Sequence, residues 1–180
     1  MVTKATTLPE PGPIPPSVEW KLVRRSGADS EERTYTQSEL SIEGEARILG
    51  MGTKIGALLK EKDFDINRIA NMIQSEGDLD WDAIFEAITL VTENAPALVA
   101  ETALTFVSIF PTSDDGTPNR EYDDHQKFMR GAINVSKFTQ MVRVFVAQND
   151  WERMARPFWN RATPQRTDPD PTSETSTQES

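Results

Sequence analysis

The stretch LSIEGEARILGMGTKIGALL, residues 40–59, has the apolar spacing of a long helix and holds four of the nine glycines in the 180-residue chain. Ser41 suits an N-cap, and acidic residues follow in the first turn, where the helix dipole favours negative charge. The residues at helical spacing predict a stripe that faces a core, and they are Ile48, Met51, Ile55, Leu58 and Leu59. Each glycine inside a helix costs about 1 kcal/mol relative to alanine. Gly52 and Gly56 share one face, which predicts close approach of another backbone, or else local bending and flexibility.

Caps and apolar periodicity predict further helices along the chain. They are expected near 65–75, capped by Asp63 or Asp65, from a cap at Asp80, from a cap at Asn94 with Pro96 in the first turn, over 123–133, over 136–148, and briefly from a cap at Asp150. The helix that begins at Asp80 is expected to bury Trp81, Ile84, Phe85, Ile88 and Val91. This helix and the next, which ends before Pro111, are predicted to form a helical hairpin.

The predicted fold class is mainly α, a compact helical domain of about six or seven helices with a small N-terminal β-hairpin and disordered ends. Two short strand-like runs around the turn SGADS predict the hairpin over residues 17–37. Five prolines in residues 1–16 predict a disordered, proline-rich arm. Residues 163–180 lack large apolar side chains and predict a disordered acidic tail, which leaves 17–162 as the domain.

Charge is distributed unevenly along the chain, whose net charge is −10. No Lys or Arg lies between Arg68 and Arg120, whereas residues 124–162 are rich in both. One interpretation is that acidic helices pack beside basic ones in the same fold. The other is that either side steers a protein partner of opposite sign. The acidic balance argues against nucleic-acid binding, since that binding depends on clustered cations.

The sequence predicts neither an enzyme nor a cofactor or metal site. His125 is the single histidine, and it is interpreted as a surface helix residue because no nucleophile motif accompanies it. DLDWD resembles the start of a calcium loop, but Ala83 and Thr89 stand where that loop needs glycine and glutamate. Asp80 is therefore expected to act as a helix cap. The sequence has no cysteine and no apolar run long enough to predict a secretory signal or a membrane span.

Aromatic residues gather near the end of the predicted domain at Trp151, Phe158 and Trp159, with arginines between them. Such residues stack on bases in proteins that bind single-stranded nucleic acids. The preferred interpretation is that they pack the last helix onto the domain, because the rest of the chain is acidic.

Three segments resemble the tail assembly chaperones of long-tailed bacteriophages, in the form found in phages of actinobacteria. They are a Y-x-Q-x-x-LS entry into the first long helix, an APxLVxE helix start, and a late aromatic helix that ends in QN. The residues that carry the resemblance are Tyr35, Gln37, Leu40 and Ser41 in the first, Ala95, Pro96, Leu98, Val99 and Glu101 in the second, and Gln148 and Asn149 in the third. The resemblance covers roughly residues 33–150.

The resemblance implies a non-enzymatic function in the host cytoplasm, absent from the mature virion. Proteins of this family are thought to coat the tape measure protein until tail tube subunits displace them, and they are often made in two lengths by a ribosomal frameshift. The partners that the resemblance implies are the tape measure protein, the tail tube protein and further copies of the chain. The candidate contact residues are Gly52, Gly56, Phe145, Trp151, Phe158 and Trp159. The alternative is a structural virion component or adaptor.

Overall fold

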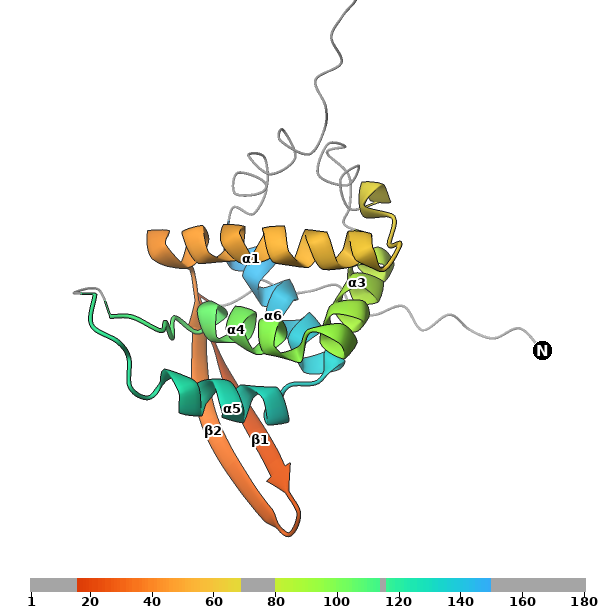
Figure 1. Cartoon of the computed structure of the whole chain (residues 1–180). Coiled ribbons are helices and arrows are strands. Elements are labelled where there is room, and N and C mark those ends of the chain that lie inside the picture. The colour runs from red at the N-terminus through yellow and green to blue at the C-terminus, as the bar shows by residue number, and fades with distance from the viewer. Residues whose placement is uncertain (1–15, 69–79, 114–115, 150–180) are drawn as a thin grey trace, which may run out of the picture.

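The computed structural model describes residues 16–68, 80–113 and 116–149, and the elements are labelled as in Figure 1. The chain begins with an antiparallel pair, β1 (Ser17–Ser26) and β2 (Asp29–Ser38), in which Ser17 lies opposite Ser38 and Ser26 opposite Asp29. The two-residue loop begins at Gly27, whose φ of 63° is the left-handed value that the first position of a type II′ turn requires. The predicted hairpin is confirmed.

Alternation along the hairpin buries one face and exposes the other. Trp20, Leu22, Tyr35 and Gln37 are buried on the inner face, and the side chains between them are exposed. An isolated two-stranded hairpin is marginally stable in water. Here α5 packs against β1 and α6 against β2, so the helices supply the missing contacts. The tip of the hairpin extends beyond α5 (Figure 1).

The first long helix is α1 (Ile42–Glu61), and its predicted cap is confirmed, because the Ser41 side chain accepts a hydrogen bond from the Gly44 N–H at 3.2 Å. Met51 and Leu59 of the predicted stripe are buried, while Ile48, Ile55 and Leu58 are half-buried. The next helix begins at 66, after Asp65 accepts a hydrogen bond from the Asn67 N–H. The remainder of that predicted helix lies outside the described residues.

Two apolar helices follow, α3 (Trp81–Asn94) and α4 (Pro96–Phe106), and the chain turns by 118° between them. Asp80 caps α3 as predicted, since its carboxylate accepts from the Ala83 N–H at 3.0 Å. The predicted cap at Asn94 is wrong. Asn94 instead donates from its side-chain amide to the Leu90 carbonyl at 2.8 Å, because it is the last residue of α3. Ala95 holds the cap position of α4 without a side-chain hydrogen bond.

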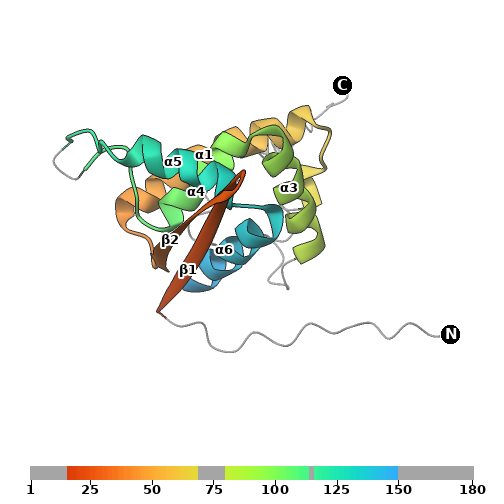
Figure 2. The same ribbon diagram turned by 90° about the horizontal axis from the view of Figure 1, so that it is seen from below.

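The last described helices are α5 (Tyr122–Ala132) and α6 (Val135–Gln148), both within one residue of prediction at their starts. Asn134 caps α6 through a 2.9 Å hydrogen bond from the Lys137 N–H. Seen from below, α5 and α6 lie on two sides of the hairpin, with α4 behind them (Figure 2). These elements make a mainly helical fold with an N-terminal hairpin, which confirms the predicted class.

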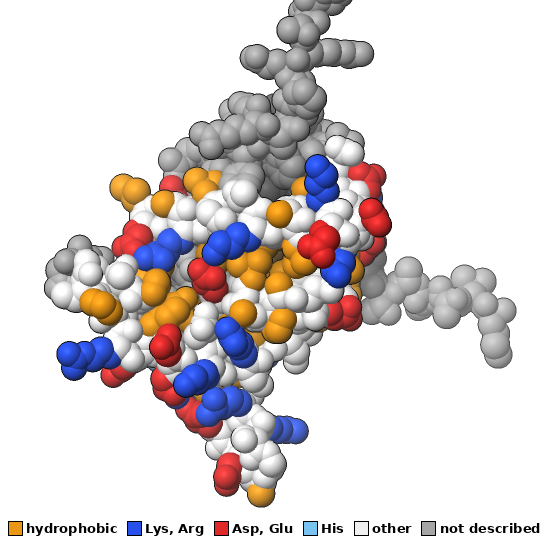
Figure 3. Space-filling view, viewed as in Figure 1, with side chains coloured by type: hydrophobic (Ala, Val, Ile, Leu, Met, Phe, Trp, Pro, Cys, Tyr) orange, Lys and Arg blue, Asp and Glu red, His pale blue; other side chains and the backbone are white. Residues whose placement is uncertain are grey.

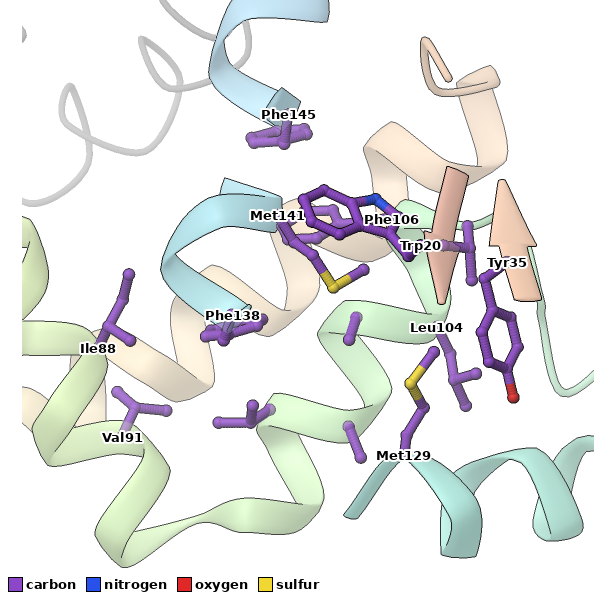
Figure 4. Packing of buried hydrophobic residues seen from close by; sticks show 14 of the residues in the cluster. Trp20, Tyr35, Ile88, Val91, Leu104, Phe106, Met129, Phe138, Met141 and Phe145 are labelled. Carbon is purple, nitrogen blue, oxygen red and sulfur yellow. The ribbon is translucent and has the colours of Figure 1, made fainter. Parts of the chain in front are cut away.

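Helix α4 forms the centre of the core because it contacts α1, α3, α5 and α6. Leu104 is fully buried, and the Phe106 ring stacks on Phe138 and Phe145, with ring centroids 6.1 and 4.8 Å apart (Figure 4). Phe85 was expected on the buried face of α3, but its side chain is 49% exposed. The buried face of α3 is narrower than predicted, since it is formed by Ala83, Ala87, Ile88 and Val91.

No single helix within the described ranges is long and apolar enough to cross a membrane. Only α3 and α4 together, as a sharply bent pair, reach the required length and apolar composition.

Candidate partner-binding surfaces

The four glycines of α1 occupy different environments. Gly44 is buried over Leu40, and a Cβ placed there would lie 3.2 Å from the Leu40 Cδ2 atom. Gly50 is exposed, and a Cβ there would meet nothing within 4 Å. A Cβ on Gly56 would lie at an ordinary 3.7 Å from the Ile66 Cδ1 atom. Close packing inside the domain therefore accounts for Gly44, while Gly50 has no packing reason.

Gly52 and Gly56 share their side of α1 with Leu49, and all three residues are half-buried. We name this side, formed by Leu49, Gly52 and Gly56, the glycine flank. Positions three and four apart on a helix are neighbours on its surface, so the flank is continuous. Because glycine lacks a side chain, a second helix can lie closer to the α1 backbone here than along the rest of the helix.

Replacing Gly50 with alanine is expected to raise the free energy of unfolding by about 0.5–1 kcal/mol, because the change favours the helix and the new methyl group meets no neighbour. Gly44→Ala is the comparison, since its methyl group has to displace Leu40 and should lose that gain. Chemical unfolding followed by circular dichroism gives both values. Equal stabilisation by the two variants would contradict this assignment of the glycines.

The opposite side of α1 packs against α4. Charged side chains lie beside the hydrophobic ones between the two helices (Figure 3). Lys54 Nζ lies 3.9 Å from the Glu101 carboxylate across this boundary. Arg47 donates to the Thr112 hydroxyl at 3.1 Å and covers the Phe110 ring, with its guanidinium carbon 5.2 Å from the centroid. Polar contacts thus close this side of α1.

The aromatic candidates divide into two groups. Phe145 is 8% exposed and stacks on Phe106, so the structure places it in the core and leaves its ring no surface to offer a partner. This position corrects its selection as a contact residue. Trp151, Phe158 and Trp159 lie outside the described residues.

The residues that carry the family resemblance join distant parts of the fold. The buried Gln37 side chain accepts from the Trp20 Nε1–H and donates to the Met141 carbonyl, both at 2.9 Å. It therefore links β1, β2 and α6. The Asn149 side chain accepts from the Leu40 N–H and donates to the Phe145 carbonyl, both at 2.8 Å.

The second motif segment forms the start of α4. Pro96 is its first residue, where the absent N–H has no partner to lose. Val99 is buried, and Glu101 is the residue that faces Lys54 of α1. The motif residues therefore serve mainly in contacts within the domain, and none of them lies on the glycine flank.

His125 was expected at the surface, but it is half-buried against the hairpin, with its side chain 23% exposed. Its Nδ1 atom lies 3.0 Å from the Tyr35 hydroxyl and 3.4 Å from Arg33 Nη1. Burial raises the pKa of the Tyr35 phenol above its ordinary value. The helical spacing did not reveal this contact because the partners are 90 and 92 residues away in sequence.

Arg33 joins the hairpin to α5. It donates to Asp124 at 2.7 Å and to Glu31 at 2.7 Å, and its guanidinium carbon lies 4.7 Å from the Phe128 ring centroid. The hydrogen bond from Arg33 holds the pKa of Asp124 below its usual range. Arg33 has one carboxylate partner on β2, Glu31, and one on α5, Asp124. The cluster is therefore an ion-paired junction between these two elements.

The Arg33–Asp124 pair predicts acid sensitivity. A carboxyl whose pKa is lowered by folding stabilises the protein above its unfolded pKa of about 3.9, and this contribution is lost as the pH falls through the lower folded value. Asp124→Asn should therefore flatten the loss of stability below about pH 4. Asp123→Asn removes an equal charge from the same exposed turn and should leave that dependence in place. Urea midpoints measured from pH 2 to 6 test this difference.

Three large apolar side chains of the described residues are exposed, namely Ile42 (88%), Phe85 (49%) and Val23 (42%). Ile42 lies outside the spacing of the α1 stripe. This mismatch is the feature of the sequence that could have predicted its exposure. Phe85 follows the exposed Asp82 by three residues on α3, so the two are neighbours on the helix surface.

The acidic and basic regions of the sequence also meet inside the fold. Helix α3, which has no basic residue, packs against α6, and the Arg143 guanidinium carbon lies 4.7 Å from the Trp81 ring centroid. Arg68 reaches Glu86 at 2.9 Å. The packing of α3 against α6 supports the interpretation that acidic and basic helices lie beside each other in the fold.

Among residues 16–68, 80–113 and 116–149, no group of three or more histidine, aspartate or glutamate side chains is placed to hold a metal ion. The chain matches no protein-family model, no curated protein and no solved structure.

Proposed function

We propose that the protein is a tail assembly chaperone of a long-tailed bacteriophage, which binds the tape measure protein in the host cytoplasm and leaves before the virion matures. The proposal starts from the three motif segments. In the first, Gln37 binds the Met141 carbonyl of α6, and Leu40 binds Asn149 of the third.

The observation that carries the proposal is the glycine flank of α1. A tape measure chain is expected to be largely amphipathic helix, and such a client binds by laying its apolar face on an apolar helical surface. Leu49 supplies an apolar contact on the flank, and the two glycines allow close approach of the client backbone. The α4 side of the same helix is already crossed by Lys54 and Arg47.

Co-expression with the tape measure protein of the same phage tests the proposal. Wild type should co-purify with the client and raise its soluble fraction. Gly56→Leu places a large side chain on the flank and should reduce the co-purified client about tenfold or more, the effect of about 1.4 kcal/mol of lost contact. Gly50→Leu introduces the same side chain on the exposed side of α1 and is the matched control.

Both variants should keep the wild-type circular dichroism spectrum and a comparable thermal midpoint. If the client does not associate with wild type, or if the two variants reduce association equally, the proposal fails.

A second candidate function is that of a structural adaptor in the virion. The observation that favours it is Phe85, exposed beside carboxylates on a helix without basic residues, which suits docking onto a basic partner surface. An adaptor remains in purified particles at fixed stoichiometry, whereas a chaperone does not. Quantitative mass spectrometry of the particles distinguishes the two functions.

A further inference from the structure

The exposed side of α3 carries an aromatic ring between carboxylates. Phe85 is 49% exposed, and Asp82 and Glu93 are exposed on the same side of the helix. Positions 82, 85, 89 and 93 follow one another at intervals of three or four residues, so they form one continuous strip over about three turns. We name Asp82, Phe85 and Glu93 the acidic strip.

Contacts within the described part of the chain do not account for the acidic strip. No ion pair joins the Asp82 or Glu93 carboxylate to another described residue. Glu93 lies in the last turn of α3, where the negative end of the helix dipole disfavours a carboxylate. No described cation covers the Phe85 ring, whereas Arg33 and Arg143 each lie 4.7 Å from the centroid of another ring. The strip therefore suits a basic partner surface.

The C-terminal end of α5 presents the opposite charge. Lys127 and Arg130 are exposed neighbours on the helix, and neither has an ion-pair partner among the described residues. Gly131 is exposed beside them, and a Cβ there would lie 2.8 Å from the Cγ and Cδ atoms of Arg24. The two acidic residues of α5 lie in its first turn, at the other end. We name Lys127, Arg130 and Gly131 the basic end of α5.

The two surfaces complement each other in shape and charge. A ring that lies over Gly131 would contact the apolar stem of Arg24 and the guanidinium of Arg130, the kind of contact that arginine makes with aromatic rings elsewhere in this fold. Carboxylates on both sides of that ring would then lie near cations. Lys and Arg side chains gather over α5 and the hairpin (Figure 3). Helix α4 separates α3 from α5 (Figure 1), so the surfaces meet only between copies.

We propose that the acidic strip of one copy binds the basic end of α5 of a second copy, with Phe85 over Gly131. Because the two surfaces differ, each bound copy keeps one of them available, and further copies can add in the same direction. Exposed ion pairs contribute little each, and the net charge of −10 repels copies, so the association should be weak in solution. The glycine flank takes no part in this contact, which does not depend on any client.

Sedimentation velocity of the full chain tests the contact at concentrations up to about 1 mM, the range of weak dissociation constants. Wild type should associate at low salt and return to the monomer at about 0.5 M salt, because exposed pairs are then screened. Reversing the strip with Asp82→Lys and Glu93→Lys should weaken association at least about tenfold. Reversing the basic end with Lys127→Glu and Arg130→Glu should have a similar effect.

Matched control variants separate this contact from the effect of net charge. Glu32→Lys with Glu61→Lys changes the net charge as much as the reversed strip does, and Lys60→Glu with Lys62→Glu as much as the reversed basic end. All four positions are exposed and lie outside both surfaces. The control variants should associate within about threefold of wild type, since a net charge distant from the contact acts weakly. Losses equal to those of the reversed variants would overturn the proposal.

Mixing the two reversed chains gives the sharpest test. The reversed strip then meets the reversed basic end, and the unchanged strip meets the unchanged end, so association should return to about the wild-type level. Phe85→Ala should weaken wild-type association without changing the charge. If Asp82→Lys prevents folding of α3, Glu93→Lys with Phe85→Ala replaces the reversed strip. A mixture that stays monomeric, or a wild type that is monomeric at low salt up to about 1 mM, would overturn the proposal.

Discussion

Replacing Phe145 with alanine is expected to lower the free energy of unfolding by about 3–5 kcal/mol, the cost of removing a buried aromatic ring from a packed core. The ring is 8% exposed and stacks on Phe106 at 4.8 Å, so its loss leaves a cavity that closes only if α4 and α6 move toward each other. This cost is a large part of the 5–15 kcal/mol by which a domain is usually stable. Chemical denaturation followed by circular dichroism measures it.

Phe85→Ala is the control, because it removes the same ring from a site that is half-exposed. It should change stability by about 1 kcal/mol or less. Phe145→Leu keeps most of the buried volume and should recover much of the loss. A Phe145→Ala protein as stable as wild type, yet deficient in client binding, would return this residue to the partner-contact set and contradict its position in the core.

The second large effect is expected for Gln37→Ala. Its side-chain amide is 1% exposed and makes two buried hydrogen bonds, one with Trp20 and one with the Met141 carbonyl. Removing the amide leaves the indole N–H without its acceptor and opens a cavity, at a combined cost of about 2–4 kcal/mol. Gln140→Ala, on the exposed side of α6, should stay within about 0.5 kcal/mol of wild type.

Gln37→Glu adds a pH signature that a mere packing role would not produce. The introduced carboxylate accepts from Trp20 but faces the Met141 carbonyl without a proton to donate, and burial raises the pKa of such a group. Stability should therefore be lowest near neutral pH. It should recover as the pH falls toward the unfolded value of about 4.3, where the protonated carboxyl donates to Met141. Identical pH profiles for Gln37→Glu and wild type would show that this amide bridge is not formed.

Local sequence chemistry was sufficient to predict most of the helices and the hairpin. Ser41 and Asp80 cap the helices that their positions indicated, since a side chain that bonds the backbone three residues later needs no distant partner. The predicted N-cap at Asn94 was wrong because asparagine occurs at either end of a helix. Two helices separated by one residue leave the sequence pattern ambiguous about which end it occupies.

The candidate site was less predictable because burial depends on contacts far apart in sequence. Phe145 lies at helical spacing whether its ring meets Phe106 or a partner, and periodicity alone does not distinguish the two. The Arg33–Asp124 and Tyr35–His125 contacts join residues about ninety positions apart. By contrast, the position of Gly52 and Gly56 on one side of α1 was predictable, because residues four apart are neighbours on a helix surface.

The amide bridges of Gln37 and Asn149 bear on how the chain folds as it is synthesised. They span 104 and 109 residues, from Gln37 to Met141 and from Leu40 to Asn149. A nascent chain can form the hairpin early. The hydrogen bond from Gln37 to α6 cannot form until α6 has left the ribosome. The N-terminal hairpin therefore reaches its final position only after residue 149 has been synthesised, and a polypeptide truncated within α6 would be exposed to proteolysis.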